Sequence, residues 1–99
     1  MYNLLVVDDE IIIAEYISEL FANSHVMGDI LLEVRQANSA IQALEIMEKV
    51  HIDIILTDIS MPGMDGIEFL KRVKKDWPYA KVILMSGYDE FQYAQAAIR

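Results

Sequence analysis

The sequence predicts an α/β protein in which helices cover both faces of a parallel sheet. Four short apolar runs, each typical of a buried strand, alternate with longer segments whose apolar residues recur at helical spacing. Regular alternation of strands with helices is typical of parallel sheets, because parallel neighbours need a long crossover between them. The chain contains no internal repeat and no low-complexity tract. Right-handed crossovers are therefore expected.

The predicted elements follow one another as four strand–helix pairs. The first run, Leu-Leu-Val-Val, is continuously apolar, as expected of a strand buried on both faces. The second is more exposed, because Glu33 and Arg35 alternate with apolar residues. We expect the strands at residues 4–7, 30–37, 52–57 and 82–85, and the helices at residues 11–21, 40–47, 66–75 and 91–98.

Capping residues mark where the helices begin. Ser39, Asp65 and Asp89 each stand three positions before a Gln or a Glu, which is the spacing of a capping box at a helix N-terminus. Pro78 ends the third helix region, because proline lacks an N–H group and clashes inside a helix. These local signals agree with the helix positions that the apolar spacing predicts.

Composition argues against several classes of function. The chain has 99 residues, 55% of them apolar, which suits one domain with a packed core. Its net charge of −8 argues against direct nucleic-acid binding, because a phosphate-binding surface must be locally basic. The basic cluster within residues 71–75 is interpreted as the solvated face of a helix. There is no cysteine, and no apolar run approaches the ~18 residues of a membrane span, so we expect a cytoplasmic domain.

Acidic residues follow two of the predicted strands where each strand ends. Asp8 and Asp9 come directly after the first strand, and Asp58 follows the third. Ser86 follows the fourth. The carboxyl ends of parallel strands meet at one edge of the sheet, where ligands bind in open α/β folds. Because strands lie ~4.8 Å apart, the three acids would come within reach of one cation. Clustered carboxylates repel one another, and Mg²⁺ is the hard, oxygen-seeking ion that suits them.

The same residues could accept a phosphoryl group. A carboxylate beside Mg²⁺, here Asp58, can attack phosphorus and become an acyl phosphate. The Ser86 hydroxyl could donate a hydrogen bond to a phosphoryl oxygen. In the alternative interpretation, acids such as Asp8 and Asp9 only complement the dipoles of the helices that follow them. For Asp65, that helix-capping role is the one we expect.

Three separated motifs carry a resemblance to a known family. The segments "LLVVDDE", "LTDISMPGMDG" and "VILMSGYDEFQYAQAAI" resemble, in this order, the motifs of receiver domains from bacterial two-component response regulators. The resemblance covers the whole chain and implies a single receiver domain, residues 1–99. It implies a flavodoxin-like (CheY-like) doubly wound sheet with strand order 2-1-3-4. The last motif is most similar to receivers joined to AraC-type helix-turn-helix output domains, which implies a role in transcription regulation.

The resemblance assigns a role to each candidate site residue. Asp58 would be the phosphoacceptor, and the donor would be a phosphohistidine on a partner sensor histidine kinase. Asp9 would bind Mg²⁺ directly and Asp8 largely through water. Asp58 and the backbone carbonyl of Ser60 would complete the protein ligands. Ser86 would be the switch hydroxyl that turns toward the phosphoryl group.

The family pattern also includes parts that this chain does not contain. It continues beyond Arg99 with a fifth strand, a Lys-Pro pair and a fifth helix, so we expect an incomplete receiver domain. An exposed fourth strand would invite association, and we expect the chain to self-associate. Because the lysine is missing, an interaction module that keeps the receiver fold and works without phosphorylation is an alternative.

A phosphatase of the haloacid-dehalogenase type is a second alternative. Such enzymes also use an aspartate nucleophile with Mg²⁺ after a parallel strand. They need a second aspartate two residues later as the general acid, and this chain has Ser60 at that position. We therefore expect a signalling domain and not an enzyme.

Overall fold

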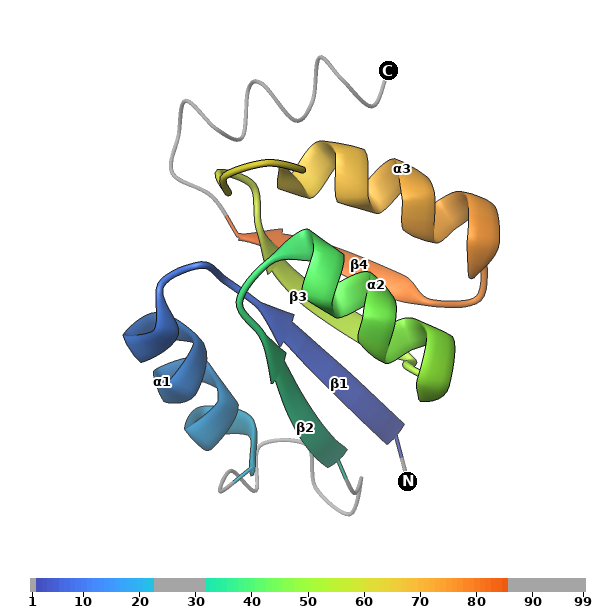
Figure 1. The fold of residues 1–99 in the computed structure, drawn as a ribbon. Coiled ribbons are helices and arrows are strands. Elements are labelled where there is room, and N and C mark those ends of the chain that lie inside the picture. The colour runs from blue at the N-terminus through green and yellow to red at the C-terminus, as the bar shows by residue number, and fades with distance from the viewer. Residues whose placement is uncertain (1, 23–31, 86–99) are drawn as a thin grey trace.

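Four parallel strands form the sheet on which the rest of the fold is built (Figure 1). The computed structural model describes residues 2–22 and 32–85. The strand order is β2-β1-β3-β4, and all three neighbouring pairs are parallel. This confirms the predicted order 2-1-3-4. The strands are β1 (Tyr2–Val7), β2 (Leu32–Ala37), β3 (Ile54–Asp58) and β4 (Lys81–Met85).

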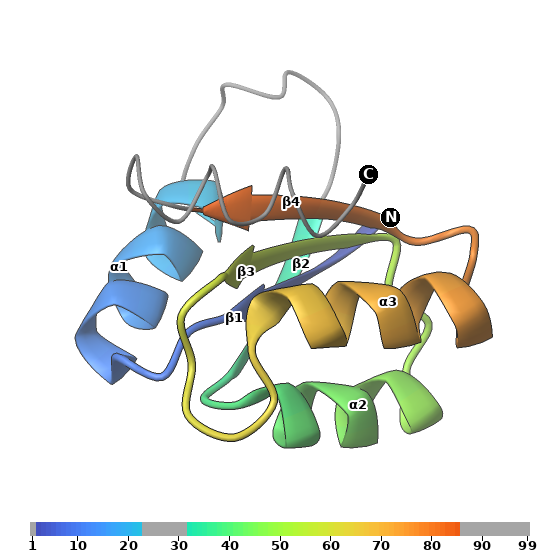
Figure 2. The same cartoon turned by 90° about the horizontal axis from the view of Figure 1, so that it is seen from above.

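Helices cover both faces of this sheet (Figure 2). The helices are α1 (Ile11–Ala22), α2 (Ala40–Lys49) and α3 (Gly66–Asp76). α2 and α3 lie together on one face, and α1 lies on the other. Within the two ranges that the structure describes, no helix has the length and apolar character needed to cross a membrane. The helix predicted at residues 91–98 lies outside the described residues.

Alternate residues of β1 enter two separate hydrophobic clusters. Leu5 and Val7 face α2 and α3, whereas Leu4 and Val6 face α1. This two-sided burial is what the continuous apolar run predicted. The larger cluster contains, among others, Ala43, Leu44, Met47, Ile55, Phe69 and Val73. Among the residues that the structure describes, the larger part of the hydrophobic core therefore lies between the sheet and the α2–α3 layer.

The predicted helix starts are confirmed where the structure describes them. The Ser39 hydroxyl accepts a hydrogen bond from the Gln42 N–H at 3.1 Å. The Gln42 side chain reaches back to the N–H of Asn38 (2.7 Å), one residue earlier than in the usual capping box. Asp65 Oδ1 accepts from the N–H groups of the second and third residues beyond it, at 3.0 and 2.9 Å. Each cap thus satisfies N–H groups that have no partner inside the helix.

The third strand differs from its predicted bounds at both ends. It begins at Ile54, two residues later than predicted, and it includes Asp58. Ile52 is fully buried in the core although it precedes the strand, so its apolar side chain reflects core packing and not strand pairing. The inclusion of Asp58 matters for the site, because the strand fixes the backbone that carries this carboxylate.

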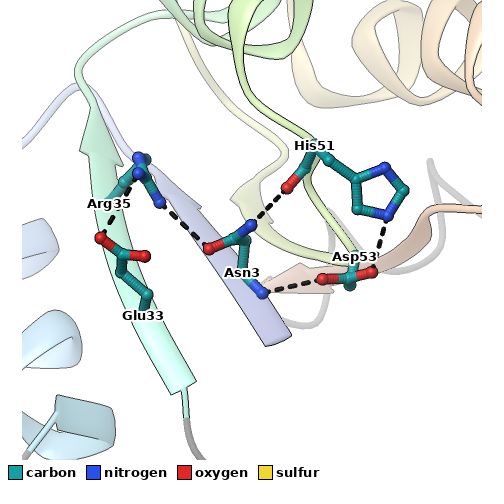
Figure 3. A network of polar contacts seen from close by, with 5 residues as sticks. All are labelled: Asn3, Glu33, Arg35, His51 and Asp53. Atoms are coloured by element: carbon teal, nitrogen blue, oxygen red, sulfur yellow. Dashed lines mark hydrogen bonds and ion pairs between the residues drawn. The ribbon is translucent and has the colours of Figure 1, made fainter. Parts of the chain in front are cut away.

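A polar network ties the amino ends of the strands together (Figure 3). The Asn3 backbone N–H donates to Asp53 Oδ2 at 2.8 Å, and the Asn3 side-chain amide donates to the His51 carbonyl at 2.7 Å. His51 Nε2 lies 2.9 Å from Asp53 Oδ1, and its ring stacks on Tyr79. Arg35 on β2 donates to the side-chain oxygen of Asn3 at 3.2 Å. These contacts join β1, β2 and the entry to β3.

The Asp53 carboxylate should stabilise the protein only above acidic pH. Its hydrogen bond from the Asn3 N–H, followed by its contact with His51, holds the pKa of Asp53 below its ordinary value of 3.8. A lowered folded-state pKa gives stability that is present above the unfolded pKa and is lost as pH falls through the folded pKa. We predict that Asp53→Asn lowers the urea midpoint at pH 7 and that the gap to wild type closes below pH ~4. Glu48→Gln, on the solvent face of α2, should leave the midpoint unchanged; an equal gap at every pH would contradict the prediction.

Burial predicts very different effects for one chemical change at two positions. Ile55 is fully buried in β3, whereas Ile12 on α1 is 82% exposed. We predict that Ile55→Ala lowers the free energy of unfolding by about 2–5 kcal/mol through lost burial and a residual cavity. Ile12→Ala should change it by less than ~0.5 kcal/mol. Chemical denaturation of both variants measures the difference, and equal losses would contradict the assigned core.

Candidate functional site

The register of the sheet brings the ends of β1 and β3 side by side. Val7 on β1 is paired with Thr57 on β3, so Asp8 and Asp58 are the next residue on each chain segment. Val6 and Leu56 both belong to the cluster on the α1 side of the sheet. Because side chains alternate along a strand, Asp8 and Asp58 are carried toward that same side.

Three carboxylates meet at this edge of the sheet. One carboxylate oxygen from each of Asp8, Asp9 and Asp58 lies within 4.8 Å of the other two. Asp8 is only 3% exposed, Asp58 is partly buried and Asp9 is exposed. This is a set of hard oxygen donors that one divalent cation can share, with an open side for water and a further ligand. The donor chemistry fits Mg²⁺.

The most buried of the three acids is held at an electrostatic cost. Burial is the main cause that raises the pKa of Asp8 above its ordinary value of 3.8. A hydrogen bond from the Glu10 N–H to Asp8 Oδ1, 2.9 Å long, acts in the opposite direction. The neighbouring Asp9 carboxylate raises the pKa further. The negative charge of Asp8 is thus disfavoured in the folded protein, and a bound cation would relieve it.

The loop after β3 holds the third acid from the other side. Asp58 Oδ1 accepts a hydrogen bond from the backbone N–H of Ser60 at 3.3 Å. The Thr57 hydroxyl donates to the Asp58 carbonyl oxygen at 3.0 Å. The Ser60 backbone N–H therefore faces the Asp58 carboxylate, and the role of the Ser60 carbonyl as a metal ligand stays a prediction. Ser86 lies outside the described residues, so its role as the switch hydroxyl stays a prediction.

Two glycines between β3 and the first turn of α3 meet different demands. Gly63 has a φ of +77°, a left-handed conformation that favours glycine. Gly66 instead lies against the main chain of Asp58, where a side chain would clash. Asp65 caps α3, as expected from its spacing to Glu68. The only sequence signal for the Gly66 contact was a glycine at a helix start.

The fold and the acidic edge together define a flavodoxin-like α/β domain with a cluster of acidic residues, suited to a cation, at the carboxyl ends of its strands. Comparison with known families makes the assignment specific. The sequence model of one family, the response regulator receiver domain, matches residues 4–99, and the chain belongs to that family. Receiver domains are signalling domains, as expected from the sequence motifs.

Two curated relatives from Bacillus subtilis show the range of proteins that carry such a domain. The uncharacterized transcriptional regulatory protein YesN is 31% identical over 99 residues, which is all of this chain and 26% of that protein. Sporulation initiation phosphotransferase F is 37% identical over 92 residues, 93% of this chain and 69% of that protein. The chain thus spans about a quarter of the first relative and just over two thirds of the second.

Two solved structures agree with the fold. A two-component transcriptional regulator AraC from Clostridium phytofermentans is 36% identical, with a TM-score of 0.85 over 100% of this chain and 74% of that one. The response regulator TrrA from Thermotoga maritima, solved in complex with Mg²⁺-BeF, is 30% identical. Its TM-score is 0.81, over 98% of this chain and 81% of that one. The resemblance to AraC-type receivers is therefore confirmed.

Removal of the Asp8 charge should stabilise the metal-free protein and weaken its response to Mg²⁺. The raised pKa of Asp8 means that stability is greatest when Asp8 is protonated and falls as pH rises through the folded pKa. In EDTA at pH 7, Asp8→Asn should therefore melt at a higher temperature than wild type. Wild type should gain about 2.7 kcal/mol of stability when Mg²⁺ is 100 times its Kd, and Asp8→Asn should gain less at the same concentration.

Thermal unfolding with and without Mg²⁺ measures both effects, with Glu48→Gln as the matched control for the loss of one negative charge. A lower melting temperature for Asp8→Asn in EDTA would contradict the electrostatic account of the cluster.

Proposed function

We propose that this chain is a phosphoacceptor receiver, in which Asp58 takes a phosphoryl group from a phosphohistidine of a sensor histidine kinase. The observation that carries the proposal is the meeting of Asp8, Asp9 and Asp58 at the carboxyl ends of β1 and β3. Membership of the receiver family supports it, as does the relative named a phosphotransferase. The Mg²⁺-BeF complex of the structural neighbour TrrA supports a cation at this edge.

Asp9, Asp58 and the Ser60 carbonyl would hold Mg²⁺ directly, and Asp8 would act largely through water. Asp8 is buried and Asp9 is exposed, which is compatible with this division. When bound, Mg²⁺ would offset the charge on the phosphoryl oxygens and on the clustered carboxylates. Ser86 would donate its hydroxyl hydrogen bond to a phosphoryl oxygen.

The transfer is a single exchange of bonds at phosphorus. A carboxylate oxygen of Asp58 forms a bond to phosphorus while the phosphorus–nitrogen bond of the donor histidine breaks. The bonding electrons go to the departing imidazole nitrogen, which takes up a proton. The product is an acyl phosphate on Asp58. The hydrogen bond from the Ser60 N–H to Asp58 Oδ1 helps to orient the carboxylate before attack.

The receiver would switch an output module that acts on transcription. The relatives named as transcriptional regulators, YesN and the AraC regulator, support this part of the proposal. With an acidic net charge of −8, the receiver segment itself would bind the kinase and not nucleic acid. A cytoplasmic location would bring the receiver together with the kinase and with the output module. Self-association of the chain stays a prediction that light scattering can test.

Labelling with acetyl phosphate tests the proposal. Wild type should incorporate phosphate in the presence of Mg²⁺ and should stay unlabelled when EDTA is present from the start of the reaction. Asp58→Asn should abolish labelling, because the amide cannot form the acyl phosphate. Asp76→Asn, which removes the carboxylate that pairs with Arg72 at the end of α3, should be labelled like wild type. Equal labelling of Asp58→Asn and wild type would remove Asp58 from this role, and a folded wild type without label would favour the interaction module.

A further inference from the structure

The first turn of α3 touches the main chain that carries Asp58. The Gly66 N–H donates to the Ile59 carbonyl at 2.8 Å. Gly66 is buried, and a Cβ atom on it would lie 2.3 Å from the Asp58 carbonyl oxygen and 2.8 Å from the Ile59 Cα. Both atoms belong to the backbone, so neither can rotate away as a side chain would. Only glycine fits between this turn and the end of β3.

Neither side of this contact can move easily. Carbon–oxygen contacts ordinarily lie at about 3.3–3.6 Å, so an alanine would require a displacement of roughly 1 Å. Ile67, the next residue of α3, is buried against Ile59, and Leu84 of β4 packs on the pair. Phe69, one helical turn into α3, is fully buried in the main core. Part of the displacement must therefore fall on the backbone of Asp58 and Ile59.

We propose that Gly66 is a positioning residue for the acidic site: its missing side chain lets α3 hold the Asp58 backbone where the three carboxylates can share one cation. The inference rests on the proposed function and specifies which contact sets the geometry of the site. Metal and transfer sites need their groups held within about 0.5 Å, and a shift of about 1 Å lowers a reaction rate about 100-fold. The clash at Gly66 is of that size.

The loop contains its own control. Gly63 precedes the helix, and a Cβ atom on it would meet nothing within 4 Å. Its φ of +77° nevertheless makes any other residue strained. Gly63→Ala should therefore lower the melting temperature by about 4–8 °C without a displacement of Asp58. Gly63→Ala thus shows the effect of a lower stability alone, with which the effect of a displaced Asp58 in Gly66→Ala can be compared.

Calorimetric titration with Mg²⁺ alone, together with thermal unfolding, tests the inference on wild type and both glycine variants. Gly66→Ala should weaken Mg²⁺ binding and raise its Kd about 10- to 100-fold, the range for residues that orient metal ligands. Gly63→Ala should keep the wild-type Kd although it melts lower. A folded Gly66→Ala with the wild-type Kd would overturn the inference and leave the proposed function standing. Absence of Mg²⁺ binding by folded wild type would overturn both.

A measurement on wild type covers the case in which Gly66→Ala does not fold. The Gly66 amide proton, bonded to the Ile59 carbonyl, should shift in NMR spectra as Mg²⁺ is added, with the same Kd as the amide of Asp9. If the chemical shift of the Gly66 amide does not change while that of the Asp9 amide does, the inference is overturned.

Discussion

The in-register parallel pairing of β1 with β3 is the constraint on which the site depends. It aligns Val7 with Thr57, so the acids that follow end at the same height on the same side of the sheet. Slippage by one residue would turn every side chain of a strand to the opposite face. Burial of alternating residues on both faces of β1 makes such slippage costly. Core packing thus holds together three negative charges that would otherwise separate.

The two ends of the sheet are linked through this register. Asn3 and Asp53 bond to each other twice through main-chain and side-chain groups at the amino end. The same number of residues separates Asn3 from Asp8 as separates Asp53 from Asp58. The polar network in Figure 3 therefore aligns the acids at the far end as well as joining the strands. The contact of Gly66 then fixes the loop beyond β3, so the site is constrained from the sheet and from α3.

Local patterns were enough to predict the parallel sheet, the caps at Ser39 and Asp65 and the convergence of the acids, whereas the strand order was predicted only from the resemblance to receiver domains. Each feature predicted from local patterns depends on spacing along the chain or on the general geometry of parallel sheets. The network around Asn3 and the Gly66 contact were not predicted, because they depend on how closely segments far apart in sequence approach. The start of β3 was placed too early for a related reason: Ile52 is apolar because it fills the core, not because it pairs in the sheet.

A crystal structure of the protein with Mg²⁺ and beryllofluoride, an analogue of the phosphoryl group, tests the central claim most directly. The account predicts one Mg²⁺ about 2.0–2.1 Å from oxygens of Asp9, Asp58 and the Ser60 carbonyl. It also predicts the beryllium on the second carboxylate oxygen of Asp58. An empty acidic edge under these conditions, or the analogue bound to another residue, would contradict it.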